Sequence, residues 1–542
     1  MVRVDRRAFL GAGIAGIGGL ACPVQAALGA IGFTSGIASG EPSQSSVLLW
    51  TRFVPRAGGS AVVEAEISSK ADFSNTSGGG SITTGPERDH SVKIVIGGLK
   101  PGKIYHYRFR GPDGSVSAVG RTRTLPEGPT PGFRLGIFSC SNLGFGWFNA
   151  YGHAAARSDL DLILHLGDYL YEYRRGKYPV AGDTAPGRVV EPADEAIALA
   201  DYRLRHASYR SDADLQTLTA RLPMIAMWDD HESADDAWAG GAENHTPARE
   251  GPWDVRKAAA VRAYREWMPV SDGANKSYRI GDLATLFLPE TRFARSEPLA
   301  LDPALAERLA GGGDVSIALA AFRDGAWQDP ARTMMGMARE AWLGAGLAAS
   351  RRAGIAWQLL GQQVLVGTLA MSRTTADWLA RTEDPEVRAG AALRFAASQA
   401  GLPYSFDMWD GFPKARERLL ESALAADAEL VVLTGDSHNA WAFDLDRGGT
   451  AAGVEFAGQS VTSPGIEGTL KGLDPKTVAR AVVERNRQLR WADTSLRGYM
   501  TLALSREEAR CEWLFLETVR ARSTRIAGRR RMRVRRGARR LS

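Results

Sequence analysis

The stretch "LDLILHLGDYLYEY" (residues 160–173) carries the strongest structural signal in the chain. Its apolar run, Leu162-Ile163-Leu164, is typical of a strand that is buried on both faces. Gly167 and Asp168 end the run, and three tyrosines follow within five residues. Gly-Asp is a common turn pair, so one interpretation is a simple turn. The other interpretation is that Asp168 and Tyr171 point into one pocket and hold a metal ion.

Similar apolar runs recur through the second part of the chain and are separated by stretches with helical periodicity. The runs cover residues 134–140, 223–232, 283–292, 355–366 and 429–438. Segments 254–267 and 413–427 between them read as amphipathic helices. This alternation predicts an α/β or α+β class, in which helices and sheet form layers, over residues 128–519.

The first part of the chain, residues 31–127, reads instead as short strands separated by Gly, Ser and Pro turns. The β-rich segments are "VLLWTRFV" (47–54), "VVEAEISS" (62–69) and "SVKIVI" (91–96). Tyr105 and Tyr107 follow a turn, in a pattern that resembles the tyrosine corner of fibronectin-type sandwiches. We expect a small β-sandwich domain here, joined to the second domain by the Pro/Gly-rich residues 126–132.

The N-terminal segment, residues 1–30, has the pattern of a targeting signal. Arg6 and Arg7 precede a weakly apolar stretch rich in Gly and Ala, which is typical of a Tat-type export signal. We therefore expect the Tat machinery to export the folded protein to the periplasm or the cell exterior. Cys22 hints at a lipoprotein, but Gly19 stands where a lipidation motif has a larger apolar residue, so this alternative is disfavoured.

The net charge of +6 comes from the C-terminus, because eleven arginines lie between Arg520 and Arg540. Without them the chain carries 67 − 11 = 56 basic residues against 61 acidic ones, so the body is mildly acidic. The segment 520–542 shows no apolar periodicity and is predicted to be a disordered basic tail. Such a tail is a candidate contact for anionic polymers. The three cysteines do not indicate a disulfide framework.

Polar side chains follow four of the apolar runs, at the point where each run ends. These side chains are Cys140 after the first run, Asp168 and Tyr171 after the second, Asp229, Asp230, His231, Glu232, Asp235 and Asp236 after the third, and Asp436 and His438 after the last. Ligands in layered α/β folds collect at the carboxyl ends of the strands. We therefore expect these side chains to face one crevice.

Carboxylates gathered at one place need a countercharge, because like charges at close range cost several kcal/mol when they are desolvated. Oxygen-rich ligands suit calcium, magnesium or manganese, and Cys, Tyr and His add affinity for iron or zinc. Each piece also has a structural interpretation. Cys140 could be a buried small hydrophobic residue, and the acidic run 229–232 could complement a helix dipole. A site without metal would require all of these separate structural interpretations to be true at once.

The order of the motifs resembles that of the PhoD-like phosphatase family of metallophosphoesterases. The motifs are "FTSGIASGEPSQSSVLLWTR" (33–52), "FSCSN" (138–142), "HLGDYLYEY" (165–173), "WDDHESADDAW" (228–238), "FDMWDGFPKARERLL" (406–420) and "LTGDSHNAWAFDL" (433–445). The resemblance spans roughly residues 31 to 518. Single pieces are weak signals, but the combination is specific.

The resemblance implies a centre with one Fe3+ and two Ca2+ ions. By motif, Cys140, Asp168 and Tyr171 would hold the iron, Asp436 would complete its shell, and Asp168 would bridge to calcium. The remaining candidates in or next to the metal shell are Asp230, Asp235, Asp410, with Asp407 as its competitor, and His438. The chain departs from the family at Asp235, where many relatives have Asn, and at Glu290, where relatives tend to have Asp.

The resemblance also implies hydrolysis of phosphate mono- or diesters by metal-activated water, outside the cytoplasmic membrane. Asp168 would act through the metals, and His231 or His438 would protonate the leaving alkoxide, with His231 preferred. Tyr169 and Tyr173 are expected to be packing residues. Two alternatives remain open at this point. One is a phosphodiesterase of phospholipase D type, and the other is a non-catalytic surface protein with structural metals.

Overall fold

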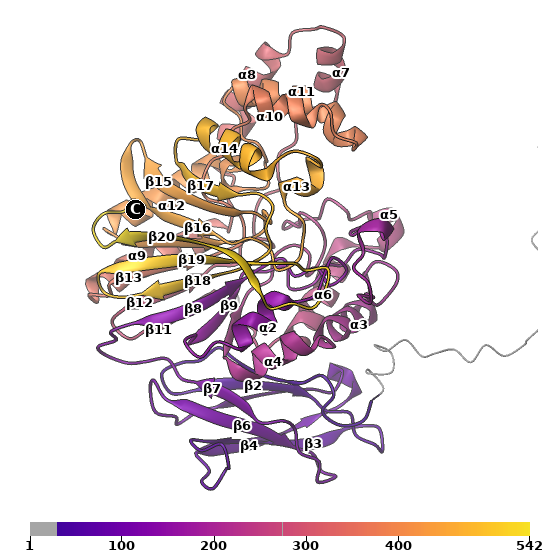
Figure 1. Cartoon of the computed structure of the whole chain (residues 1–542), viewed down its shortest axis with the longest axis vertical. Helices are drawn as coiled ribbons and strands as arrows, with labels where there is room; N and C mark the ends of the chain where they lie inside the picture. Colours follow the sequence, from indigo (N-terminus) through magenta and orange to yellow (C-terminus); the bar gives the residue numbers. More distant parts are fainter. Residues whose placement is uncertain (1–29, 274) are drawn as a thin grey trace, which may run out of the picture.

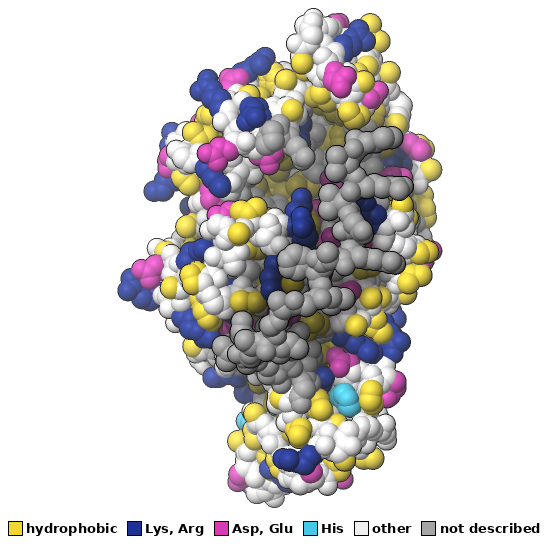
Figure 2. All heavy atoms as spheres, turned by 90° about the vertical axis from the view of Figure 1, so that its right-hand side faces the viewer, with side chains coloured by type: hydrophobic (Ala, Val, Ile, Leu, Met, Phe, Trp, Pro, Cys, Tyr) yellow, Lys and Arg dark blue, Asp and Glu magenta, His cyan; other side chains and the backbone are white. Residues whose placement is uncertain are grey.

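The computed structural model describes residues 30–273 and 275–542, so the twin-arginine motif at Arg6 and Arg7 lies outside the described residues. Figure 1 shows a layered body with a β-sandwich at one end and a group of short helices at the other. On the face seen in Figure 2, outside the grey atoms, basic and acidic side chains are intermingled. Within the described part, no helix is long and apolar enough to cross a membrane.

Two large sheets form the centre of the body. The nine-stranded sheet has the order β20 (Ile526–Arg535), β19 (Glu508–Leu516), β18 (Gly498–Leu504), β8 (Phe133–Phe138), β9 (Leu162–His165), β10 (Met224–Ala226), β1 (Ile37–Gly40), β2 (Val47–Arg52) and β5 (Ser91–Ile96). The seven-stranded sheet has the order β11 (Lys276–Ile280), β12 (Ala284–Leu288), β13 (Trp357–Gly361), β14 (Leu430–Thr434), β16 (Thr450–Ala457), β15 (Ala440–Arg447) and β17 (Leu489–Asp493). Strands β8, β9 and β10 run parallel, and so do β12, β13 and β14.

The central strands are apolar throughout because each face of each sheet is covered. Along β9, Leu162 and Leu164 pack into the core between the two sheets, whereas Ile163 packs under the helices on the outer face. In β14, Val431 and Leu433 face the inter-sheet core, and the alternate residues face the outer helices. This two-residue period with both faces buried explains why the runs read as continuous rather than alternating.

Helices cover both outer faces and complete a four-layer arrangement. The nine-stranded sheet is covered by α2 (Asn149–Ala155), α3 (Leu199–Arg210), α4 (Ala213–Arg221) and α6 (Trp253–Trp267). The seven-stranded sheet is covered by α9 (Met337–Arg352) and α12 (Pro413–Ala425). The helices α7 (Ala304–Ala310), α8 (Ser316–Asp324), α10 (Arg373–Leu379), α11 (Pro385–Gln399) and α14 (Pro475–Arg485) gather at the end away from the sandwich (Figure 1). The fold is therefore the mixed α and β layered class expected from the sequence.

The N-terminal sandwich shares a sheet with the body. Its four-stranded sheet, β4 (Gly78–Thr84), β3 (Ala61–Ser68), β6 (Ile104–Arg110) and β7 (Gly120–Arg123), packs on β1, β2 and β5 through a separate apolar core. The backbone N–H of Lys100 donates to the hydroxyl of Tyr105 at 2.9 Å, which is the hydrogen bond of a tyrosine corner. Strand β1 pairs with β10 at Gly40 and Met224, so the sandwich continues the central sheet.

The C-terminal segment differs from the disordered tail predicted for residues 520–542. Strand β20 pairs with β19 along the edge of the nine-stranded sheet. Met532 and Val534 point into the inter-sheet core, and Arg531 and Arg533 on the other face pair with Glu512 and Glu508. The prediction was wrong because the two apolar residues alternate with arginines at the strand period, and their carboxylate partners come from β19.

Removing β20 should therefore destabilise the protein. Truncation after Val519 exposes the pocket filled by Met532, Val534 and Leu541, and each such side chain is worth about 1.5–3 kcal/mol of burial. We expect the free energy of unfolding, measured by urea denaturation, to fall by about 5 kcal/mol. Arg531→Ser on the exposed face is the matched control and should change it by less than about 0.5 kcal/mol. Equal stability of the truncated and full-length chains would contradict the edge-strand role.

Candidate active site

The polar residues that follow β8, β9, β10 and β14 converge on one centre. The described residues contain four triplets whose potential ligand atoms all lie within 4.8 Å of one another. These triplets are Cys140, Asp168 and His438; Asp168, Asp230 and His231; Asp229, Asp230 and Asp436; and Asp230, Asp235 and Asp236. Because they share Asp168 and Asp230, they form one continuous cluster. This cluster is called the acidic centre below.

The backbone is strained at several residues of the acidic centre. Cys140, Asp168, Asp436 and His438 all have φ values between 52° and 59°, in the left-handed region that non-glycine residues rarely adopt. Such conformations cost of order 1–3 kcal/mol each and persist only where the surroundings enforce them. Next to Asp168, Gly167 has φ 104°, and a Cβ there would lie 2.4 Å from the Cβ of Asp229. The "GD" pair therefore brings two strand ends into contact.

Tyr171 points into the acidic centre. Its hydroxyl donates to Asp168 Oδ2 at 2.9 Å, accepts from Ser463 Oγ at 2.8 Å, and lies 3.1 Å from His438 Nε2. His438 Nδ1 lies 2.9 Å from the carbonyl oxygen of Pro464, which can only accept, so Nδ1 carries the proton and Nε2 is free to coordinate. Burial lowers the pKa of His438 to about 3 and keeps its imidazole neutral, as a metal ligand must be.

The neighbouring tyrosines differ from each other. Tyr169 is buried, and its ring contacts His165, His206 and Tyr209, as a packing residue would. Tyr173 was also expected to be a packing residue, but its hydroxyl donates to Asp235. Of the three tyrosines, Tyr171 and Tyr173 therefore point toward the carboxylates, and Tyr169 packs among aromatic rings.

His231 is held by a carboxylate that the sequence reasoning missed. Its Nδ1 donates to Glu172 Oε2 at 2.8 Å, and Glu172 Oε1 accepts from the backbone of Asp235 at 2.9 Å and from Asn244 at 2.8 Å. Burial alone would lower the pKa of His231, but Asp230, Glu172 and Asp168 raise it well above its ordinary value. These carboxylates therefore favour the protonated form of His231, whose Nε2 lies 3.7 Å from Asp235 Oδ1.

Arg292 is the second functional residue that sequence reasoning missed. Its fully buried guanidinium pairs with Asp229, lies 3.0 Å from Asp407 and 3.1 Å from Asp436, and reaches Asp230 at 3.5 Å. Glu290, whose departure from the family had no explanation, accepts from the backbone N–H groups of Arg292 and Phe293 at 2.7 Å. Glu290 therefore shapes the turn that delivers Arg292.

The acidic centre has more carboxylates than protein countercharges. Its countercharges are Arg292, Arg295 and His231. The carboxylates of the centre and those in contact with it are Asp168, Glu172, Asp229, Asp230, Glu232, Asp235, Asp236, Asp407 and Asp436. Buried oxygens of Asp168, Asp229 and Asp230 lack a hydrogen-bond partner, and buried charges need pairing or metal ions. The donor set, which includes the thiol of Cys140, therefore fits bound cations.

The structure brings most of the predicted ligands together but changes two of their positions. Asp436 lies with Asp229 and Asp230, and His438 instead shares the group of Cys140 and Asp168. Asp410 stands apart from the acidic centre: its Oδ2 accepts from the backbone of Leu369 at 3.1 Å, and it belongs to none of the four triplets. Its competitor Asp407 joins the centre through Arg292 and Arg295.

Carboxylates, imidazoles and a phenol at the ends of parallel strands between two packed sheets form a candidate metal centre of the kind that a metal-dependent phosphoesterase needs. Residues 135–513 match the PhoD-like phosphatase model, and residues 19–126 match the model of the PhoD-like phosphatase N-terminal domain. The chain belongs to the PhoD-like phosphatase family and is a phosphoric ester hydrolase. The resemblance inferred from the motifs is thereby confirmed.

Two relatives support this assignment, and a third shows the fold alone. The chain is 32% identical over 505 residues to alkaline phosphatase D of Bacillus subtilis (strain 168), covering 89% of this chain and 77% of that protein. The solved structure of PhoD has a TM-score of 0.76 at 27% identity and covers 95% of this chain and 92% of that one. A purple acid phosphatase from yellow lupin (Lupinus luteus) seeds has a TM-score of 0.53 at 11% identity, covering 92% and 74%.

The crowding of carboxylates predicts that the stability of the metal-free protein, measured in the presence of a chelator, depends on pH. Burial raises the pKa of Asp436 from 3.8 to about 7, although Arg292 opposes this. Between these values the folded protein holds a proton that the unfolded chain has released, so stability falls as pH rises. Asp436→Asn has no carboxylate to titrate at this position, so its stability does not fall in this way as pH rises. The free energy of unfolding of Asp436→Asn minus that of wild type should therefore increase by about 2 kcal/mol from pH 5 to pH 8.

Urea denaturation in EDTA at the two pH values measures this difference. With excess calcium the order at pH 8 should reverse, because the ion needs the ionised carboxylate. A pH-independent difference between Asp436→Asn and wild type in EDTA would contradict the crowded-carboxylate account.

Proposed function

We propose that this phosphoesterase is an exported phosphatase of alkaline type, which uses Fe3+ and Ca2+ to hydrolyse phosphate monoesters, diesters or both. The observation that carries the proposal is the meeting of Cys140, Asp168, Tyr171 and His438 beside the carboxylates of the acidic centre. A thiol, a phenol and an imidazole next to a carboxylate suit iron, and the all-oxygen remainder suits calcium.

The residues divide between the two kinds of ion. Cys140, Asp168, Tyr171 and His438 would hold iron, with Asp168 shared between sites, and the calcium candidates are Asp229, Asp230, Asp235, Asp236 and Asp436. When bound, such cations activate water and neutralise phosphate oxygens. Arg292 contacts Asp229, Asp230 and Asp436 and helps to hold them in place. Arg295 pairs instead with Asp407, which Arg292 also contacts.

His231 is the better candidate for the proton donor to the leaving alkoxide. The neighbouring carboxylates raise its pKa and favour its protonated form, and Glu172 accepts from Nδ1, so that Nε2 faces Asp235. His438, by contrast, is neutral, and its only proton is engaged by Pro464. General-acid catalysis needs a protonated group within hydrogen-bond reach of the leaving oxygen.

A phosphodiesterase of phospholipase D type is a second candidate, and one feature favours it. A cavity of about 1380 Å³ borders the centre at His438 and carries an apolar wall. The wall contains Met371, Trp378, Leu379, Leu470, Leu473 and Val478. An acyl chain of a phospholipid would suit this wall. The non-catalytic alternative is not supported, because the chain is a member of a hydrolase family.

Export through the Tat machinery is proposed from Arg6 and Arg7. The guanidinium fork is not reproduced by an ammonium group, so replacing both arginines by Lys should retain the protein in the cytoplasm. Cell fractionation and immunoblotting measure this, with the Arg3→Lys variant as the control. Normal export of the double variant would contradict the proposal. Contact of the arginines of β20 with anionic polymers stays a prediction.

The metal centre is tested by Asp168→Asn and Tyr171→Phe. Asp168→Asn should lower kcat on p-nitrophenyl phosphate at least about 100-fold while the circular dichroism spectrum is kept. Tyr171→Phe keeps the ring but removes the oxygen, so it should weaken the visible phenolate-to-iron band and lower iron content, with activity falling alongside. Tyr169→Phe is the matched control, because this tyrosine packs away from the centre. A colourless, iron-free, fully active wild type would refute the iron assignment.

A further inference from the structure

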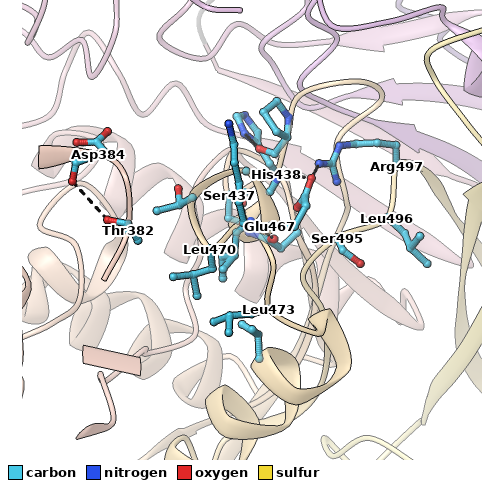
Figure 3. A pocket seen from close by; sticks show the side chains of 18 of the residues that line it. Thr382, Asp384, Ser437, His438, Glu467, Leu470, Leu473, Ser495, Leu496 and Arg497 are labelled. Carbon is cyan, nitrogen blue, oxygen red and sulfur yellow. Dashed lines mark hydrogen bonds and ion pairs between the residues drawn. The ribbon is translucent and has the colours of Figure 1, made fainter. Parts of the chain in front are cut away.

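A large cavity extends outward from the acidic centre. Ser437 and His438 line it at the inner end, together with Tyr178, and Figure 3 shows Glu467 and Arg497 on the adjoining wall. No carboxylate of the acidic centre lines this cavity in the described part of the chain. The cavity meets the acidic centre at His438. A substrate whose reacting phosphate lies at that centre would therefore place its remaining groups in the cavity.

Arg497 is a buried cation in this wall. Its side chain is 9% exposed, whereas the other cationic residues that line the cavity are exposed. One terminal nitrogen, Nη2, pairs with Glu467. The other, Nη1, is buried and has no hydrogen-bond partner. A buried guanidinium nitrogen without an acceptor is costly, so the site is poised to receive one.

Arg497 also lies within electrostatic reach of the acidic centre. Burial is the main cause of the low pKa of His438, and the charge of Arg497 lowers it further. Burial also raises the pKa of Tyr178, and the charge of Arg497 partly opposes that rise. The Tyr178 hydroxyl lies 3.5 Å from His438 Nδ1, on the side of the imidazole away from Tyr171. The charge of Arg497 therefore acts on both His438 and Tyr178.

Glu467 is the internal competitor for this guanidinium. It belongs to the short helix α13 (Ile466–Thr469), and its Oε1 accepts from Arg497 and from the backbone of Gly465. Its Oε2 is buried without a hydrogen-bond partner. The ion pair thus holds Arg497 in one orientation and leaves Nη1 unoccupied. The alternative is that the ion pair has only a structural role and connects α13 to the start of β18.

We propose that Arg497 is an anion subsite, which binds a second phosphate or carboxylate group of the substrate through Nη1. The inference rests on the proposed function only in assuming that the reacting phosphate lies at the acidic centre. Arg497 is suited to this task because its buried position fixes the guanidinium, whose fork matches phosphate and carboxylate oxygens. The exposed charges around the cavity mouth are of both signs and give no comparable preference.

The test uses two substrates that differ by one phosphate, fructose 6-phosphate and fructose 1,6-bisphosphate, with phosphate release as the readout. Wild type should prefer the bisphosphate in kcat/KM about 10- to 100-fold beyond the statistical factor of about two. Arg497→Gln should lower this preference about 10- to 100-fold, mainly through KM, and Arg497→Lys should lower it less. Lys471→Gln, an exposed cation of the same cavity, is the control and should leave the preference within about twofold.

Glu467→Gln separates the subsite from a structural ion pair. Removing the competing carboxylate should raise the preference for the bisphosphate, which is the opposite sign from Arg497→Gln. Equal losses on both substrates in both variants, with lowered thermal midpoints, would overturn the proposal. So would the absence of a bisphosphate preference in wild type.

If wild type hydrolyses neither compound, the proposed function fails, and the subsite is then judged by calorimetric binding of the same pair. Tighter binding of the bisphosphate that is lost in Arg497→Gln supports the subsite. Equal binding of the two sugars overturns it.

Discussion

The excess of buried negative charge at the strand ends is the constraint on which the rest of the site depends. Asp168, Asp229 and Asp230 are almost fully buried, and each keeps an oxygen without a hydrogen-bond partner. Arg292 neutralises only part of this charge, although it contacts several carboxylates at once. Cations bound here would offset the excess charge, so we expect metal binding to stabilise the folded protein.

The fold brings these charges together by burying both faces of its central strands. Strands covered on both sides can expose polar groups only at their ends, and the parallel strands of the two sheets end at the same side of the body. The left-handed conformations of Cys140, Asp168, Asp436 and His438 then turn each side chain inward. The strain at these residues is sustained by the close contact of the loops, as at Gly167 and Asp229.

The local sequence was sufficient to predict the candidate metal ligands, but not the residues that hold those ligands in place. Cys140, Asp168, Tyr171 and His438 lie two to six residues after the ends of β8, β9 and β14, so their meeting was predictable. Glu172 and Arg292 were missed because their partners lie about 60 residues away, and no local pattern links them. Asp407 and Asp410 are three residues apart in one loop, and only the position of Arg292 decides between them. The edge strand β20 was missed because its carboxylate partners belong to β19.

The most direct test of the charge constraint is a crystal structure of the purified protein with anomalous difference maps above and below the iron absorption edge. We expect an iron peak between Cys140, Asp168, Tyr171 and His438, and further metal density among Asp229, Asp230 and Asp436 that lacks the iron edge. Maps without metal density at either position, from a protein that is folded and active, would contradict it.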